Sequence, residues 1–153
     1  MTNGEKRRLL EENYLDFFSL AMAMLRNKQD ALDAVQEALV RVLTTNRIRD
    51  NVVRYTYQTV RNCAIDIIRH RRMFLPVDAD LPDTNAEHEE RLKQVARLRD
   101  ELPEALKSLV ELHDEEGYSL AELSVLTEIP VSTIRRRLNE AHKILEKRIT
   151  EEI

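Results

Sequence analysis

Three consecutive arginines, Arg135 to Arg137, lie in a stretch of helical periodicity that follows Pro130. Counting 100° per residue from Ile134 places Leu138, Ala141, Ile144 and Leu145 on a buried arc. The opposite arc carries hydrogen-bond donors: Ser132, Arg135, Arg136, Asn139, His142 and Lys143. Arginine binds guanine through two hydrogen bonds, asparagine binds adenine in the same way, and lysine binds backbone phosphate. The spacing predicts a DNA-reading helix, with Arg137 at its edge reaching a flanking phosphate or packing by its stem.

The segment before these arginines has the spacing of a helix-turn-helix. Leucines at 120, 123 and 126 supply the buried side of a first helix, and Ile129 with Pro130 fills the turn. Glu128 stands where such turns usually carry a left-handed glycine, so we expect this turn to be strained or differently shaped. The alternative is an ordinary helical hairpin with a basic exposed face.

A second basic surface is predicted on a helix over about 51–72. One side of that helix carries Arg54, Gln58, Arg61, Arg69 and Arg72, with no acid among them. Such a stripe is typical of a surface that follows nucleic-acid phosphates. Tyr55 lies beside it and is either a base-stacking group or a half-buried aromatic side chain.

A third surface lies on a predicted helix over about 30–45. Asp33, Glu37 and Val40 share one face there. Acids repel phosphate, so an exposed valine between two acids favours a protein-docking ridge over a DNA contact. The alternative is a solvated helix side.

The 153-residue composition, with 2 glycines, 4 prolines and 34% charged residues, predicts an all-α fold. Residues 1–72 carry 13 Lys and Arg against 9 Asp and Glu, whereas residues 73–117 carry 5 against 13. Basic surplus on either side of an acidic middle indicates nucleic-acid binding at both ends. The lone Cys63 forms no internal disulfide and is expected in the core. Without a signal peptide or a long apolar run, the chain is expected to be cytoplasmic, with no membrane insertion.

Helical periodicity predicts further helices over about 8–26, 87–100, 103–115, 119–127 and 131–149. Residues 73–90 hold two prolines and six acids with little periodicity, and are expected to form a flexible linker. The predicted architecture is therefore two small helical domains, 1–72 and 91–153, joined by the acidic linker 73–90. No phosphate-binding glycine loop or metal-ligand spacing is evident, so we expect no enzyme activity, no cofactor and no metal.

In this order the motifs resemble the extracytoplasmic-function group of sigma factors in the sigma-70 family. "DALDAVQEALVRVL" resembles the segment that docks on the RNA polymerase clamp helices, and "YQTVRNCAIDIIRHRR" resembles the helix that melts and reads the −10 element. The segment from Leu102 to Leu138 resembles the −35-reading domain. Where that family usually has tryptophans, this chain has Leu43 and Tyr55. The resemblance assigns residues to three sites: the polymerase-docking helix with Asp33, Gln36, Glu37 and Arg41, the −10 helix with Asn62, Asp66 and Arg69, and the start of the −35 recognition helix with Thr133 to Arg137.

The resemblance implies that the partners are core RNA polymerase, promoter DNA and an anti-sigma factor. Two other readings stay open at this stage. A stand-alone helix-turn-helix regulator would need a dimer interface or a ligand pocket. A sigma-like decoy would bind an anti-sigma factor without supporting transcription.

Overall fold

The computed structural model describes residues 2–46, 48, 51–75 and 102–152, and all regular secondary structure in these ranges is helical. The expected all-α fold is therefore confirmed for this part of the chain. Residues 76–90 of the predicted linker, and the helix predicted over 87–100, lie outside the described residues.

The N-terminal domain contains α1 (Asn3–Glu12), α2 (Tyr14–Met24), α3 (Lys28–Thr44) and α4 (Val52–Arg72). The prediction of one helix over 8–26 was wrong, because the chain breaks at Asn13 and begins a new helix there. The Asn13 side chain donates to the carbonyl oxygen of Leu9 at 2.8 Å, which closes α1. Periodicity did not reveal the break, because Leu10 and Phe17 on either side of it are both buried.

Asparagine side chains set the starts of the next two helices. Asn27 accepts a hydrogen bond from the backbone N–H of Asp30 at 3.1 Å and caps α3. Asn51 accepts from the N–H groups of Val53 and Arg54, at 3.0 and 3.2 Å, and caps α4. An N-cap satisfies backbone donors that have no partner within the helix. The predicted helices over 30–45 and 51–72 are confirmed to within two residues.

The C-terminal domain contains α6 (Leu102–Val110), the π-helical turn η1 (Glu111–Glu115), α7 (Leu120–Thr127) and α8 (Val131–Glu152). Gly117 has a φ of 79°, which suits glycine and separates η1 from α7. Ser119 and Glu122 form a capping box at the start of α7, with hydrogen bonds of 3.0 and 3.1 Å. The helix-turn-helix of α7 and α8 follows the predicted bounds.

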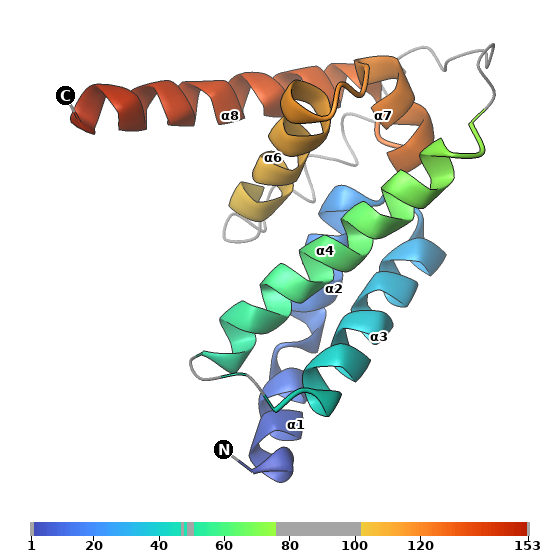
Figure 1. Ribbon diagram of the computed structural model, residues 1–153, viewed down its shortest axis with the longest axis vertical. Helices are drawn as coiled ribbons and strands as arrows, with labels where there is room; N and C mark the ends of the chain where they lie inside the picture. The colour runs from blue at the N-terminus through green and yellow to red at the C-terminus, as the bar shows by residue number, and fades with distance from the viewer. Residues whose placement is uncertain (1, 47, 49–50, 76–101, 153) are drawn as a thin grey trace.

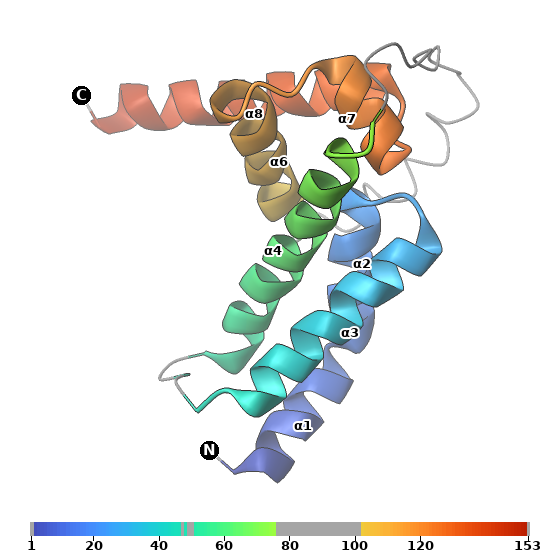
Figure 2. The same cartoon turned by 45° about the vertical axis from the view of Figure 1, so that its right-hand side comes forward.

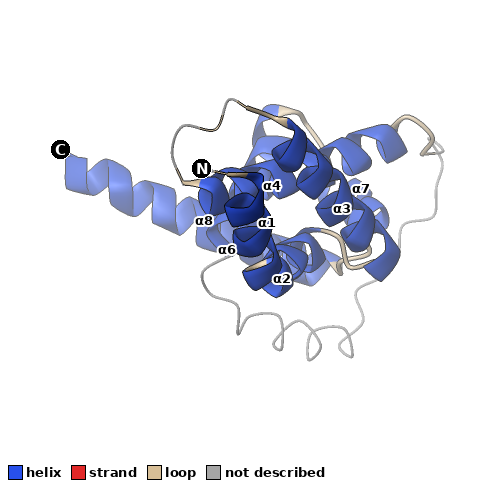
Figure 3. Ribbon diagram, turned by 90° about the horizontal axis from the view of Figure 1, so that it is seen from below, coloured by secondary structure: helices blue, strands red, loops and turns tan. Residues whose placement is uncertain are grey.

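Helices α2, α3 and α4 lie side by side, and α6 and α7 cover one end of α4 (Figures 1 and 2). From below, α8 extends well beyond the rest of the molecule (Figure 3). This projection explains a failed expectation: Ile144 and Leu145, predicted to be buried, are each 43% exposed. The other domain does not reach this part of α8.

The two domains share one hydrophobic core. Buried side chains from the end of α2 and from α4, such as Leu25 and Ile68, join the same cluster as Leu112 and Ile129 of the C-terminal domain. The backbone N–H of Arg26 donates to the carbonyl oxygen of Thr127 at 2.9 Å across this contact. The domains expected from the sequence are thus packed against each other rather than held only by their linker.

Glu128 takes the left-handed conformation expected at this turn, with φ 61° and ψ 18°. A side chain with a Cβ in this region costs roughly 1–2 kcal/mol, and glycine avoids that cost. Glycine also loses more freedom on folding, by roughly 0.5–1 kcal/mol. The net gain in stability on replacing Glu128 by glycine is therefore expected to be about the difference between these terms.

We expect Glu128→Gly to raise the free energy of unfolding by about 0.5–1 kcal/mol, because the exposed Glu128 side chain loses little in exchange. The matched control is Glu140→Gly, at an exposed position inside α8, which should lower stability by about 1 kcal/mol. Urea unfolding followed by circular dichroism measures both. Lower stability for Glu128→Gly would contradict the strain argument.

Candidate promoter-binding and partner-docking surfaces

The outer face of α8 presents most of the donors predicted from the sequence. Arg135, Arg136, Asn139 and Lys143 are exposed, and Ser132 and His142 are partly buried. The imidazole Nε2 of His142 lies 2.7 Å from a carboxylate oxygen of Asp114 in η1. Ile134 and Leu138 on the opposite side are buried. The orientation of α8 about its own axis, as deduced from periodicity, is therefore correct over the first three turns of the helix.

Two predicted contact residues on α8 are instead buried. Thr133 is fully enclosed, and Arg137 is only 6% exposed. The Arg137 Nη1 donates to the carbonyl oxygen of Ala23, at the end of α2, at 2.6 Å. Burial, and secondarily the neighbouring Arg136, lower the pKa of Arg137 to about 10, so it keeps its charge at neutral pH. In this arrangement Arg137 binds the other domain, which sequence reasoning missed.

The first half of the α4 stripe faces solvent. Arg54, Tyr55, Gln58 and Asn62 are exposed. Tyr57, one turn away on the inner side, instead packs edge-on against Phe17 with ring centroids 4.9 Å apart. This half of α4 leaves an amide, a guanidinium and an aromatic ring free to meet a ligand.

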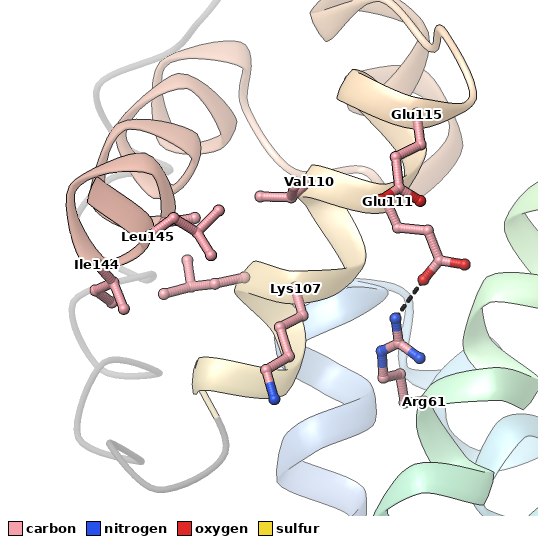
Figure 4. A pocket seen from close by; sticks show the side chains of 9 residues that line it. Arg61, Lys107, Val110, Glu111, Glu115, Ile144 and Leu145 are labelled. Atoms are coloured by element: carbon pink, nitrogen blue, oxygen red, sulfur yellow. Dashed lines mark hydrogen bonds and ion pairs between the residues drawn. The ribbon is translucent and has the colours of Figure 1, made fainter. Parts of the chain in front are cut away.

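The second half of the stripe is paired with carboxylates of the C-terminal domain. Arg61 contacts Glu111 and donates through Nε to Ser108 Oγ at 3.0 Å (Figure 4). Arg69 makes a two-pronged contact with Glu116, at 2.9 and 2.8 Å, and its Nη2 reaches Glu111 at 3.2 Å. Each guanidinium therefore has an anionic partner contributed by the other domain.

Arg72 is the third arginine of α4 that pairs with an acid of the C-terminal domain. Its Nε donates to Glu122 at 2.9 Å, and its guanidinium carbon lies 3.7 Å from the centre of the buried Tyr118 ring. Hydrogen bonds from Arg69 and Arg72 lower the pKa of Glu116 and of Glu122, respectively, and those of both arginines are raised in return. We call Arg61, Arg69 and Arg72, with Glu111, Glu116 and Glu122, the interdomain ion-pair row.

The predicted docking residues lie together on the outer side of α3. Asp33, Gln36, Glu37 and Arg41 are exposed, and Val40 is 58% exposed, a large value for an aliphatic side chain. Arg41 pairs with Glu37 at 3.1 Å within the helix. An exposed apolar side chain surrounded by charged side chains is the arrangement expected of a protein contact.

A cleft of about 460 Å³ runs beside this face, between α3 and α4. Asp66 and His70 of α4 line it opposite Asp33 and Glu37. Cys63 lies at its base, is 3% exposed as expected of a core residue, and has a pKa raised by burial. Asp30 and Arg71 also line the cleft, and they form an ion pair between α3 and α4. Within the described ranges, no group of His, Cys, Asp and Glu side chains is placed to hold a metal ion.

Sequence reasoning missed the acids that complete the interdomain ion-pair row. Glu111, Glu116 and Glu122 were not identified as site residues. One signal pointed to Glu111 and Glu116: residues 73–117 carry 13 acids, of which seven lie after the predicted linker. That acidic surplus was assigned to the linker and to general charge asymmetry. An acidic segment opposite an arginine stripe is also the pattern of two complementary surfaces.

These features define a class of protein: a helical DNA-binding protein that joins a helix-turn-helix to a basic helix and a separate protein-docking face. Comparison with known families narrows the class. Residues 9–73 match the model for sigma-70 region 2, and residues 92–145 match the model for sigma-70 region 4. The chain belongs to the sigma-70 family, in its extracytoplasmic-function group, and acts as an RNA polymerase sigma factor.

Two relatives match most of the chain. The RNA polymerase sigma factor SigV of Bacillus subtilis is 28% identical over 143 residues, covering 90% of this chain and 86% of SigV. The RNA polymerase sigma-H factor of Pseudomonas aeruginosa is 29% identical over 152 residues, covering 84% of this chain and 77% of the relative. The family binds core RNA polymerase and promoter DNA. None of the described helices is long and apolar enough to cross a bilayer.

Arg136 and Lys143 are both exposed on α8, and we expect Arg136 to read a base and Lys143 to bind phosphate. We expect Arg136→Ala to weaken binding of the reconstituted holoenzyme to the correct −35 element by about 1–3 kcal/mol, with little effect on a scrambled element. Lys143→Ala should weaken both alike and reduce the slope of log affinity against log salt by about 0.9. Competition binding at several salt concentrations measures both quantities. Greater sequence selectivity at Lys143 would show that the helix is rotated differently on DNA.

Proposed function

We propose that three helical faces divide the work of promoter recognition. The outer face of α8 contacts the −35 element, the stripe on α4 contacts the −10 element, and the outer face of α3 docks on core RNA polymerase. The observation that carries this proposal is the exposure of Arg135, Arg136, Asn139 and Lys143 on the second helix of a helix-turn-helix. That position is the one from which such motifs present side chains to the major groove.

The proposed −10 contacts are Arg54, Tyr55, Gln58, Arg61, Asn62, Arg69 and Arg72. Guanidinium groups along one helix follow phosphates, and an exposed tyrosine stacks on an unpaired base. Stacking matters because a melted element exposes the π-faces of its bases. The proposed −35 set adds Ser132, Thr133, Arg137 and His142 to the four exposed residues. Thr133 and Arg137 are both buried, and Arg137 can contact DNA only after it leaves the carbonyl oxygen of Ala23 in the other domain.

The proposed domain limits are 1–72 for the polymerase-docking and −10 domain and 91–153 for the −35 domain, with 73–90 between them. We place the protein in the cytoplasm, where it meets RNA polymerase. Polymerase supplies the chemistry of RNA synthesis, and this chain supplies contacts alone. The two matched family regions support these limits, because they end and begin close to them.

An anti-sigma factor is the third proposed partner. A groove of about 390 Å³ between α6 and α8 is lined by Val110, Ile144 and Leu145 with Lys107 at its rim (Figure 4). An amphipathic helix of the partner would bury these apolar side chains. We expect Leu145→Asp to weaken such a complex at least about tenfold in a pull-down with candidate anti-sigma proteins, whereas Lys147→Asp should have little effect. Equal binding by both variants would exclude this groove.

Charge reversal tests the docking face. We expect the double variant Asp33→Lys/Glu37→Lys to bind core RNA polymerase roughly 100-fold more weakly, because like charges then face each other in the contact. The control is Glu11→Lys/Glu12→Lys, which makes the same charge change at exposed positions on α1. Titration of core enzyme with labelled protein measures affinity, and circular dichroism verifies the fold.

The same preparations measure initiation at a defined promoter. The control variant should start transcripts as the natural protein does, and the docking variant should not. Tight operator binding by the free protein, with no polymerase complex, would identify a stand-alone regulator and overturn the proposal. Binding of an anti-sigma factor without any initiation would identify a decoy.

A further inference from the structure

The interdomain ion-pair row occupies arginines that the proposed function assigns to DNA. Arg61, Arg69 and Arg72 lie along about three turns of α4, and each is bound by a carboxylate of the C-terminal domain. The exposed fractions of the three side chains are 20, 42 and 35%. The N–H donors that the acids occupy are not available to DNA phosphates while the acids remain in place.

The acids satisfy the arginines as phosphates would. A guanidinium presents parallel N–H donors that fit either a carboxylate or a phosphate through two hydrogen bonds. Arg69 holds Glu116 in this two-pronged manner, at 2.9 and 2.8 Å, and Arg72 holds Glu122 at 2.9 and 3.3 Å. Promoter phosphates and the acids of η1 and α7 are therefore alternative ligands for the same donors.

A packed seam beneath the ion pairs holds the two domains together. Met24 and Ile68 of the N-terminal domain meet Leu112 and Ile129 of the C-terminal domain, and the void left among them is only about 10 Å³. The Arg137 side chain adds a buried hydrogen bond to α2 within this seam. The contact thus has the apolar core and the polar rim of a specific interface.

The packed arrangement also prevents simultaneous reading of both promoter elements. Elements centred near −10 and −35 are about 25 base pairs apart, and at 3.4 Å per pair they are separated by roughly 85 Å. In this structure α4 and the helix-turn-helix are in direct contact through Arg72 and Glu122. The domains must separate before α4 and α8 reach their two elements together.

We propose that the acidic face of the C-terminal domain, Glu111, Glu116 and Glu122, acts as an intramolecular phosphate mimic that closes the free protein and masks the −10 surface of α4. This inference rests on the proposed role of α4 in binding promoter DNA. In the closed form the Arg54 end of α4 carries stripe residues that have no partner in the C-terminal domain among the described contacts, whereas Arg61, Arg69 and Arg72 are paired with its acids. DNA binding by the free protein is weak because the competent open form is a minor fraction of the molecules.

The test uses the full chain and the triple variant Glu111→Gln/Glu116→Gln/Glu122→Gln. Glutamine keeps the size of the side chain and preserves the capping box of α7, but it removes the charge that holds each arginine. The control, Glu5→Gln/Glu11→Gln/Glu12→Gln, makes the same charge change at exposed positions on α1, outside the interdomain ion-pair row. Fluorescence anisotropy with single-stranded and duplex promoter DNA measures affinity, and small-angle X-ray scattering measures the radius of gyration.

We expect the triple variant to bind DNA at least about tenfold more tightly than the natural protein, because the open fraction rises. Its slope of log affinity against log salt should be steeper by about 2–3 on duplex DNA, since three phosphate contacts no longer replace existing ion pairs. Its radius of gyration should increase, and the control should match the natural protein in all three measurements. If thermal unfolding shows that the triple variant is unstable, Glu116→Gln alone should still raise affinity about twofold.

Equal affinity and equal size for the triple variant and the control would overturn the inference. That result is separate from failure of the proposed function, which is measured with holoenzyme. Promoter-specific initiation with no effect of the triple substitution on the free protein would reject the closed form alone. An open triple variant that never forms an initiating holoenzyme would confirm the masking contact and reject the sigma-factor roles assigned to the three faces.

Discussion

The arrangement of the two domains depends on the need of the α4 arginines for anionic partners. Val60, Ala64 and Ile68 on the inner face of α4 are buried, which fixes the rotation of the helix and turns its arginine side away from α2 and α3. A partly buried guanidinium without a partner is costly, so the surface that covers it must supply acceptors. Glu111 meets Arg61 near the middle of α4, and Glu122 meets Arg72 at its end. Together these two pairs set the position of η1 and α7 along the helix axis.

The end of α2 makes this position possible because it supplies small side chains and backbone groups. Ala21 and Ala23 are buried, and their small side chains allow the C-terminal domain to pack closely against α2. The carbonyl oxygen of Ala23 accepts from Arg137, and the N–H of Arg26 donates to Thr127, so the last turn of α2 finds its backbone partners in the other domain. Unpaired backbone groups at a buried helix end would destabilise the contact. The C-terminal domain therefore supplies hydrogen-bond partners for backbone groups at the end of α2 that water or a capping side chain would otherwise have to supply.

Sequence reasoning succeeded where one helix determines its own pattern. Periodicity placed the exposed donors of α8 and the exposed face of α3, because each depends on spacing within about 20 residues. It failed where the outcome depends on a distant partner. Arg61 pairs with Glu111 and Arg137 with Ala23 across 50 and 114 residues, and no local pattern encodes such a pairing. The prediction that Ile144 and Leu145 are buried was wrong for the same reason. It assumed a packing partner along the whole of α8, and the other domain does not extend along this part of the helix.

The two faces of the N-terminal domain differ in accessibility, and under the proposed roles this difference orders the events of promoter binding. The outer face of α3, with Val40 and Glu37, is exposed in the closed form, whereas half of the α4 stripe is covered. Polymerase can therefore dock before the domains separate. Ion pairs as exposed as those in the row contribute only about 0–1 kcal/mol each, and phosphates replace the carboxylates at similar strength. The energy that opens the molecule must then offset mainly the apolar seam around Ile68 and Leu112. Under the proposed roles, docking through α3 and uncovering of the α4 arginines are therefore two separate steps.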